Sequence, residues 1–370
     1  MPAMVRSGSV SPTHLTRARV PARSVRLRQI LVCQDGTVVA MSVRQSGPVP
    51  NHSTRAPVAS TTQPGSAAIA PVVGRERELA LLGAAVRSGR DIVLEGPPGT
   101  SKTTMLRFIT ESWGTTIFLV EGNADLTPGK LIGHHDPARV IRDGYVADSF
   151  LPGPLIEAMT TGGFLYLEEL NRAPEDALNT LLTAMGERRI TVPRVATFVA
   201  APTFRVIASM NPLDDVGTAR LSMGMADRFC RLHIDYQDRR AERDIVALRA
   251  ARPAARRDPA LLDRLFDDAV AVTRATRHHP DVRQGSSVRG AIDAVLLALD
   301  LIDPLDDATL VVSGAGRAVD STYRSVVLDA LLVALTGRIH VEESSESTAE
   351  SIVRQLWEEH LIGQARAEPG

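Results

Sequence analysis

A glycine-rich loop at residues 96–103 has the residue types and spacing needed to hold phosphate groups. It follows the apolar run 91–95 and reads Gly96-Pro97-Pro98-Gly99-Thr100-Ser101-Lys102-Thr103. In such a loop, backbone N–H groups and the positive end of the next helix converge on phosphate oxygens. The lysine neutralises the β and γ phosphates, and the hydroxyl after it ligates Mg²⁺. We therefore predict a P-loop that binds ATP and Mg²⁺, formed by these residues with Thr104, in which Lys102 and Thr103 have those two roles. The alternative, a turn without a ligand, is disfavoured by Lys-Thr at this offset after a strand.

Two glutamates follow the apolar run 164–167, at the end of a predicted central strand. The carboxyl ends of parallel strands are where α/β proteins place their ligands. In P-loop nucleotide hydrolases the first acid of such a pair holds the Mg²⁺ shell and the second orients or polarises the attacking water. We assign these roles to Glu168 and Glu169. A charged helix N-terminus is the alternative for this pair.

Strand-like runs alternate with helical pattern through the middle of the chain, at residues 91–95, 116–120, 164–167 and 204–208. This alternation predicts a mostly parallel sheet covered by helices on both faces, an α/β nucleotide-binding core over residues 71–235. Two short β-branched runs flank Pro193-Arg194 and predict a β-hairpin insertion near residues 189–200. For residues 137–150, where Gly144 interrupts any period, a loop stays open as an alternative.

Helical periodicity takes over after about residue 235. It predicts helices at residues 238–251, 259–277, 288–301, 324–335 and 348–359, and so an all-helical lid domain over residues 236–362 with a tail at 363–370. At the other end, residues 47–71 are mostly Pro, Ser, Thr, Ala and Gly, which bury too little to repay the entropy of ordering. We expect residues 1–70 to be a flexible, disordered extension.

Charge and cysteine content narrow the classes of function. The chain has 42 Lys and Arg against 43 Asp and Glu, so its formal net charge of −1 gives no general attraction to nucleic acid. Cys33 and Cys230 lie far apart, which argues against a disulfide framework or a zinc site. No stretch approaches the roughly 20 apolar residues that cross a bilayer. We interpret the arginines before residue 29 as a solvated basic tail rather than a targeting peptide, and expect a cytoplasmic protein without membrane insertion.

These motifs, with Asn211 and the segment Ala226-Asp227-Arg228-Phe229, make the chain resemble AAA+ ATPases over about residues 71–362. Three further segments resemble the MoxR family within that class: Glu168-Glu169-Leu170-Asn171-Arg172-Ala173-Pro174, Ala208-Ser209-Met210-Asn211-Pro212 and Gly285-Ser286-Ser287-Val288-Arg289. The family accepts a small residue such as Ser101 before the P-loop lysine. It mostly has aspartate where this chain has Glu168. Residues 122–154 resemble its helix 2 insertion and residues 189–200 its pre-sensor insertion.

The resemblance implies roles for three more residues. Asn211 matches sensor 1, which senses the γ-phosphate and helps to place the water. Arg228 matches the arginine finger, which reaches the nucleotide of a neighbouring subunit. Arg289 matches sensor 2, which points from the lid at the nucleotide. Taken singly, each could be a turn residue or a solvated arginine, but their joint occurrence in chain order favours the functional interpretation.

The resemblance also implies an ATPase that assembles into a ring, a hexamer, and uses hydrolysis to remodel or mature a client protein. An arginine supplied in trans requires a neighbour, and repeated head-to-tail contacts close into rings. MoxR relatives work with a partner carrying a von Willebrand factor A domain, which would be a separate polypeptide here. Two alternatives stay open: a nucleotide-gated scaffold with negligible hydrolysis, suggested by Ser101 and Glu168, and a chelatase-like metal-insertion ATPase. The near-zero net charge disfavours a DNA-remodelling motor.

Overall fold

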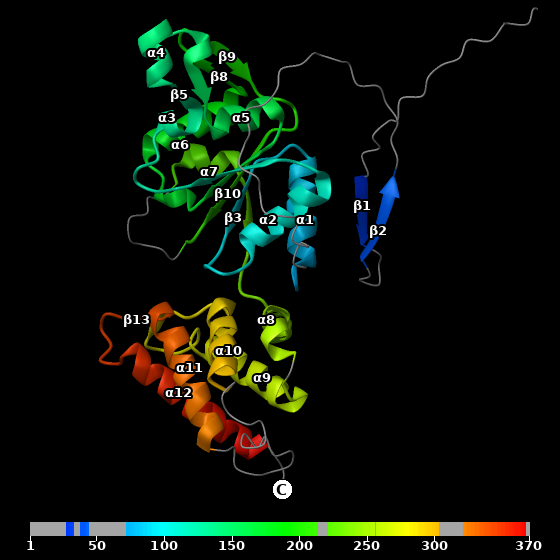
Figure 1. Cartoon of the computed structure of the whole chain (residues 1–370), viewed down its shortest axis with the longest axis vertical. Helices are drawn as coiled ribbons and strands as arrows, with labels where there is room; N and C mark the ends of the chain where they lie inside the picture. Colours follow the sequence, from blue (N-terminus) through cyan, green and yellow to red (C-terminus); the bar gives the residue numbers. More distant parts are fainter. Residues whose placement is uncertain are drawn as a thin grey trace, which may run out of the picture. The chain divides into compact units, whose positions relative to one another are not determined.

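The computed structural model describes residues 27–32, 38–43, 72–212, 221–255, 257–302 and 321–367 (Figure 1). The first two segments are strands β1 (Leu27–Val32) and β2 (Val38–Val43), which pair antiparallel within a separate unit, Met1–Pro64. The expectation of a flexible extension over residues 1–70 does not mention this pair of strands, and it stays a prediction. The rest of the predicted extension lies outside the described residues.

A five-stranded parallel sheet forms the centre of the nucleotide-binding core. Its strands lie in the order β11-β3-β10-β7-β4: β11 (Cys230–His233), β3 (Ile92–Glu95), β10 (Arg205–Met210), β7 (Phe164–Glu168) and β4 (Ile117–Glu121). The sequence pattern predicts four of them and misses β11. In that strand only Leu232 is buried, so its sequence has too little apolar character to be distinguished from a loop.

Helices cover both faces of this sheet, as the apolar character of the central strands predicts. Successive strand residues point to opposite faces, so neighbours such as Ile92 and Val93 belong to different clusters of buried side chains. One face packs against α1 (Glu76–Arg87) and α2 (Lys102–Trp113), and the other against α5 (Pro154–Thr161) and α6 (Glu175–Glu187). The predicted α/β core is confirmed.

Two insertions interrupt the core. The first contains α3 (Pro128–Ile132), β5 (Gly133–His135), α4 (Pro137–Asp143), η1 (Ala147–Ser149) and β6 (Phe150–Pro152). Because α4 and η1 occupy residues 137–149, the loop alternative for this stretch is wrong. The second contains β8 (Arg189–Val192) paired antiparallel with β9 (Ala196–Val199), which confirms the predicted hairpin.

The C-terminal region is helical, as predicted. Its helices are α8 (Arg239–Ala254), α9 (Pro259–Ala275), α10 (Val288–Ile302), α11 (Ser321–Leu335) and α12 (Ala349–Ala367), which pack around one cluster of buried apolar side chains. Two details correct the prediction. A short antiparallel pair, β12 (Val282–Gln284) with β13 (His340–Val341), lies within the lid, and α12 takes in most of the predicted tail. Both strands are too short to leave a period in the sequence.

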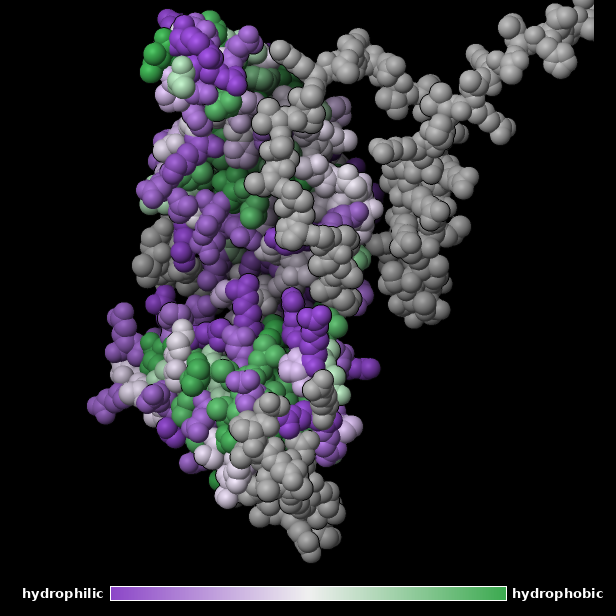
Figure 2. Space-filling model, in the orientation of Figure 1, coloured by the Kyte–Doolittle hydropathy of each residue, from purple (hydrophilic) through white to green (hydrophobic). Residues whose placement is uncertain are grey.

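Hydrophilic side chains cover most of the face drawn in Figure 2, with hydrophobic ones showing between them. Among the described residues, no helix is both long enough and apolar enough to span a bilayer.

Candidate functional site

The strand order brings three separate motifs to one edge of the sheet. The P-loop follows β3, Asn211 follows β10, and Glu168 ends β7 with Glu169 directly after it. These three strands are neighbours in the sheet. Because the strands are parallel, their carboxyl ends meet at the same edge, where this fold class binds ligands. A pocket of about 490 Å³ opens there. Its walls are Pro98, Gly99, Thr100, Ser101, Lys102, Thr103, Thr104, Glu168, Glu169, Arg172, Ser209, Met210, Asn211, Gln284, Arg289 and His340.

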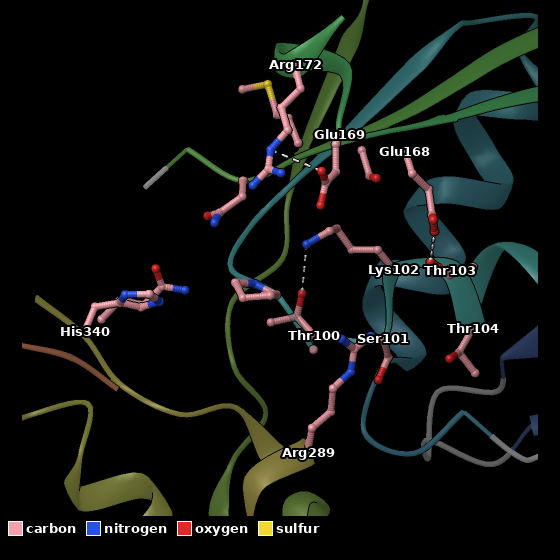
Figure 3. A pocket seen from close by; sticks show the side chains of 16 residues that line it. Thr100, Ser101, Lys102, Thr103, Thr104, Glu168, Glu169, Arg172, Arg289 and His340 are labelled. Atoms are coloured by element: carbon pink, nitrogen blue, oxygen red, sulfur yellow. Dashed lines mark hydrogen bonds and ion pairs between the residues drawn. The ribbon is translucent and has the colours of Figure 1, made fainter. Parts of the chain in front are cut away.

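Lys102 lies in the centre of the pocket and its ammonium is bound by the loop itself (Figure 3). Its Nζ donates hydrogen bonds to the carbonyl oxygens of Gly96 at 2.7 Å and Pro97 at 2.8 Å. Burial, with the nearby guanidinium groups of Arg289 and Arg75, lowers the pKa of Lys102 to about 8. An anionic ligand here would therefore relieve an unfavourable charge. Phosphate oxygens can replace the two carbonyl acceptors.

Two residues of the P-loop have left-handed backbone conformations. Gly99 has φ +76°, a backbone conformation that favours glycine. A Cβ at this position would also lie 2.3 Å from the Ser287 hydroxyl oxygen, so any larger residue would clash there. Ser101 has φ 69° and precedes the first residue of α2. The left-handed region costs non-glycine residues energy, which explains physically why glycine is usual at this point of the loop.

Thr103 and Glu168 are in direct contact, although 65 positions separate them in the sequence. The Thr103 hydroxyl donates to Glu168 Oε1 at 2.5 Å and lies 3.3 Å from the Tyr166 hydroxyl. Burial raises the pKa of Tyr166 to about 12, so this phenol stays a neutral donor. One hydroxyl and one carboxylate suit Mg²⁺, which usually takes few protein ligands and keeps waters and substrate phosphates as the others. Among the described residues, no group of three or more His, Cys, Asp or Glu could hold a metal by itself.

Glu169 has a left-handed backbone and an ion-paired side chain. Its φ is 53°, and its Oε2 lies 3.1 Å from Arg172 Nε across the turn η2 (Leu170–Arg172). In Figure 3 both side chains lie on the same side of Lys102. The sequence includes Arg172 in a family-like segment but gives no reason to place it in the pocket. The turn does so, because it folds residue 172 back over residue 169.

Asn211 lies between the P-loop and the two glutamates, as its strand position requires. It lines the pocket, and its carbonyl accepts a hydrogen bond of 3.1 Å from Asn171 Nδ2. The end of β10 is thereby tied to the turn that carries Glu169.

The lid closes the pocket from the opposite side with Arg289, Gln284 and His340. Arg289 lies near the start of α10, whose preceding residue Ser287 packs against Gly99 of the P-loop. Sequence reasoning misses Gln284 and His340. These two residues reach the pocket through the β12–β13 pairing, in which Gln284 is opposite His340. No local sequence pattern predicts that pairing.

Three predicted site residues are not walls of this pocket: Gly96 and Pro97, at the start of the P-loop, and Arg228. Arg228 ends α7 (Met223–Arg228), is exposed, and donates from Nη1 to the carbonyl of Gly224 at 2.8 Å. Its guanidinium also lies beside Gly186 on α6. It does not line the pocket of its own chain.

The comparisons agree with this geometry. Residues 91–229 match the family model of the AAA domain (dynein-related subfamily). The chain has the AAA P-loop fold. An uncharacterised protein of Staphylococcus aureus (strain bovine RF122 / ET3-1) is 34% identical over 151 residues, which are 40% of this chain and 57% of that protein. This chain thus spans little more than half the length of that relative.

Two further matches cover a larger share of both this chain and the matched protein. The uncharacterised protein YeaC of Bacillus subtilis (strain 168) is 29% identical over 241 residues, 60% of this chain and 72% of YeaC. The structure of RuvB from Thermotoga maritima, a Holliday junction branch migration motor, has a TM-score of 0.45 at 18% identity and covers 70% of each chain. The last is a likeness of fold alone.

Proposed function

We propose that this chain is a MoxR-type ATPase that hydrolyses ATP in the pocket at the carboxyl edge of its sheet. The convergence of Lys102, Thr103, Glu168, Glu169 and Asn211 on one pocket carries this proposal. A P-loop alone would support nucleotide binding. Hydrolysis needs more, and the two glutamates together with the side chain of Asn211 can supply it.

Each residue has a definite task. The P-loop amides and Lys102 bind the phosphates, because charge-assisted contacts to phosphate are the strong ones. Thr103 and Glu168 would hold Mg²⁺, which would supply positive charge beside the phosphates. Glu169 accepts a proton from the attacking water, and Asn211 orients that water. Arg289 binds the triphosphate from the lid.

Assembly into a ring, with Arg228 completing a neighbour's site, rests on the resemblance and is supported by the exposure of Arg228 outside its own pocket. Remodelling of a client protein with a von Willebrand factor A domain partner rests on the resemblance alone. The near-neutral charge of the chain supports a protein client over nucleic acid.

A nucleotide-gated scaffold with slow hydrolysis is the second candidate. The ion pair between Glu169 and Arg172 favours it, because Oε2 of Glu169 is engaged by the guanidinium at 3.1 Å rather than free to contact a water. Turnover by the purified protein separates the two candidates.

Two variants test the proposed chemistry. Lys102→Ala should lose most of its affinity for ATP, whereas Glu169→Gln should bind ATP like the wild type and hydrolyse it about 10² to 10⁴ times more slowly, the range expected for loss of a general base. Titration with a fluorescent ATP analogue and a phosphate-release assay measure the two effects. Wild-type affinity in Lys102→Ala would disprove the P-loop assignment, and an undiminished rate in Glu169→Gln would remove that residue from the mechanism.

A further inference from the structure

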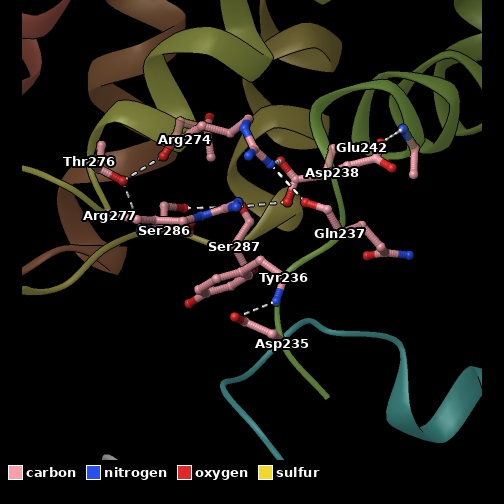
Figure 4. A network of polar contacts seen from close by, with 12 residues as sticks. Asp235, Tyr236, Gln237, Asp238, Glu242, Arg274, Thr276, Arg277, Ser286 and Ser287 are labelled. Carbon is pink, nitrogen blue, oxygen red and sulfur yellow. Dashed lines mark hydrogen bonds and ion pairs between the residues drawn. The ribbon is translucent and has the colours of Figure 1, made fainter. Parts of the chain in front are cut away.

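A buried ionic cluster lies beside the lid edge of the pocket, at the junction of the core and the lid (Figure 4). Glu242 on α8 is 1% exposed and accepts from two arginines, Arg277 Nη1 at 2.8 Å and Arg274 Nη1 at 3.1 Å. A buried carboxylate must be paired, and replacing such a cluster by apolar groups is often neutral or stabilising. Stability alone therefore does not explain a buried carboxylate paired with two arginines at this place, of which Arg277 is 7% exposed and Arg274 29% exposed.

One of these arginines holds the loop that presents Arg289. Arg277 Nε donates to the carbonyl of Ser286 at 2.7 Å, and Gly285 lies so close that a Cβ there would be 2.6 Å from Arg277 Cα. Thr276 adds a second anchor, because its hydroxyl accepts from the Ser286 backbone N–H at 3.0 Å. The position of residues 285–287 is therefore fixed by the end of α9.

The anchored loop, residues 285–287, contacts the nucleotide pocket directly. Ser287 packs against Gly99 of the P-loop, and its hydroxyl accepts from the backbone N–H of Arg289 at 3.4 Å. A shift of Ser286 would thus move the guanidinium of Arg289.

The same arginine contacts the segment that joins core to lid. The Arg277 guanidinium stacks on the ring of Tyr236 at 3.9 Å from its centroid. The adjacent Gln237 is held from both sides, because its carbonyl accepts from Arg274 at 2.7 Å and its side chain donates to the Val73 carbonyl of the core at 2.8 Å. Arg277 Nη2 is buried and has no hydrogen-bond partner among the described residues.

We propose that Arg277 is a positioning residue that sets the place of Arg289 in the pocket and couples it to the Tyr236-Gln237 linker between core and lid. This inference rests on the proposed function, in which Arg289 binds the triphosphate. The fork of the guanidinium is essential, since one side chain must reach Ser286 and Glu242 and also stack on Tyr236. Lysine keeps the charge but cannot make these contacts together.

A double-mutant cycle with Arg289 tests the coupling. Arg277→Lys should lower kcat/KM for ATP about 10-fold, within the range found for residues that share one network. In an Arg289→Ala background the same change should alter kcat/KM less than about twofold, because the residue through which Arg277 acts is then absent. Equal losses in both backgrounds, or no loss in either, would overturn the proposal.

Arg243→Lys is the matched control. Arg243 also joins α8 to α9, through Asp263 at 2.6 Å and Asp267 at 3.1 Å, and neither of these partners belongs to residues 285–287. Arg243→Lys should leave kcat/KM for ATP within about twofold of the wild-type value. Thermal midpoints of all variants show which are folded. If Arg277→Lys unfolds, Glu242→Gln replaces it in the cycle, with the same two outcomes.

The affinity of each variant in the cycle for a non-hydrolysable ATP analogue is measured as well. A wild-type protein that binds the analogue but does not turn over ATP would refute the proposed hydrolysis. The coupling between positions 277 and 289 would still be decided, by affinity: an effect of Arg277→Lys that disappears with Arg289 supports it, and one that persists overturns it.

Discussion

Ser101 shows how a single backbone angle limits the choice of residue in the P-loop. Its φ of 69° is accessible to serine only at an energetic cost, yet serine keeps the backbone N–H that phosphate binding needs. Ser101→Gly should relieve this strain, partly offset by the greater freedom of glycine in the unfolded chain, and raise the free energy of unfolding by about 0.5 kcal/mol. Urea denaturation of the purified protein measures the change.

The control is a serine with an ordinary backbone. Ser88, after α1, has φ −77°, so Ser88→Gly adds only unfolded-state freedom and should destabilise by about 0.5 kcal/mol. The opposite signs of the two changes are the test. Destabilisation by both substitutions would show that the Ser101 conformation carries no strain.

At the scale of elements, one buried carboxylate joins three lid helices. Asp268 on α9 is fully buried and accepts from Tyr323 of α11 at 2.9 Å, from His360 and Gln364 of α12 at 2.8 Å each, and from Arg264 at 3.1 Å. Burial by itself raises the pKa of Asp268, but the hydrogen bond from His360 and the charge of Arg264 outweigh it and lower the pKa below its ordinary value.

Asp268→Asn should therefore destabilise the lid by about 3 kcal/mol at pH 7, since it leaves buried partners without their charge. Because the folded-state pKa is depressed, the stability that Asp268 adds is fully present above its unfolded value near 3.9 and is lost as the pH falls through the lower folded value. The difference from the wild type should thus be constant between about pH 5 and 8 and shrink below about pH 4.

Thermal midpoints across this pH range measure the difference, with Asp263→Asn as the control. Asp263 is 72% exposed in its ion pair with Arg243, so its loss should cost at most about 1 kcal/mol. A difference for Asp268→Asn that grows on acidification would contradict the assignment.

At the scale of the whole molecule, the question is whether the site of one chain is complete. The pocket holds Lys102, both glutamates, Asn211 and Arg289, while Arg228 lies outside it. If a neighbour supplies Arg228, then Arg228→Ala should bind ATP normally and turn over about 10³ to 10⁵ times more slowly.

Mixing Arg228→Ala with Lys102→Ala tests the action in trans. A mixed ring contains interfaces that pair an intact P-loop from one variant with an intact arginine from the other, so part of the ATPase activity should return. Subunit exchange, shown by energy transfer between labelled chains, is the control. No recovery at any ratio, with exchange demonstrated, would rule out the ring mechanism.

The sequence by itself predicted the elements and the local motifs. Apolar periodicity predicts four of the five sheet strands, the inserted hairpin and the five lid helices, because burial on one or both faces leaves a period in the residues. The P-loop and the glutamate pair are equally visible, since their chemistry lies in consecutive residues.

Only the tertiary structure decided which of these residues meet. The neighbours β3, β10 and β7 bring Lys102, Asn211 and Glu169 together, and strand order follows from packing across the whole sheet rather than from any local pattern. The ion pair between Arg172 and Glu169 needs the turn η2, and His340 reaches the pocket only through the pairing of β12 with β13. Such contacts depend on long-range packing and short, weakly patterned elements, which leave no periodic signal in the sequence.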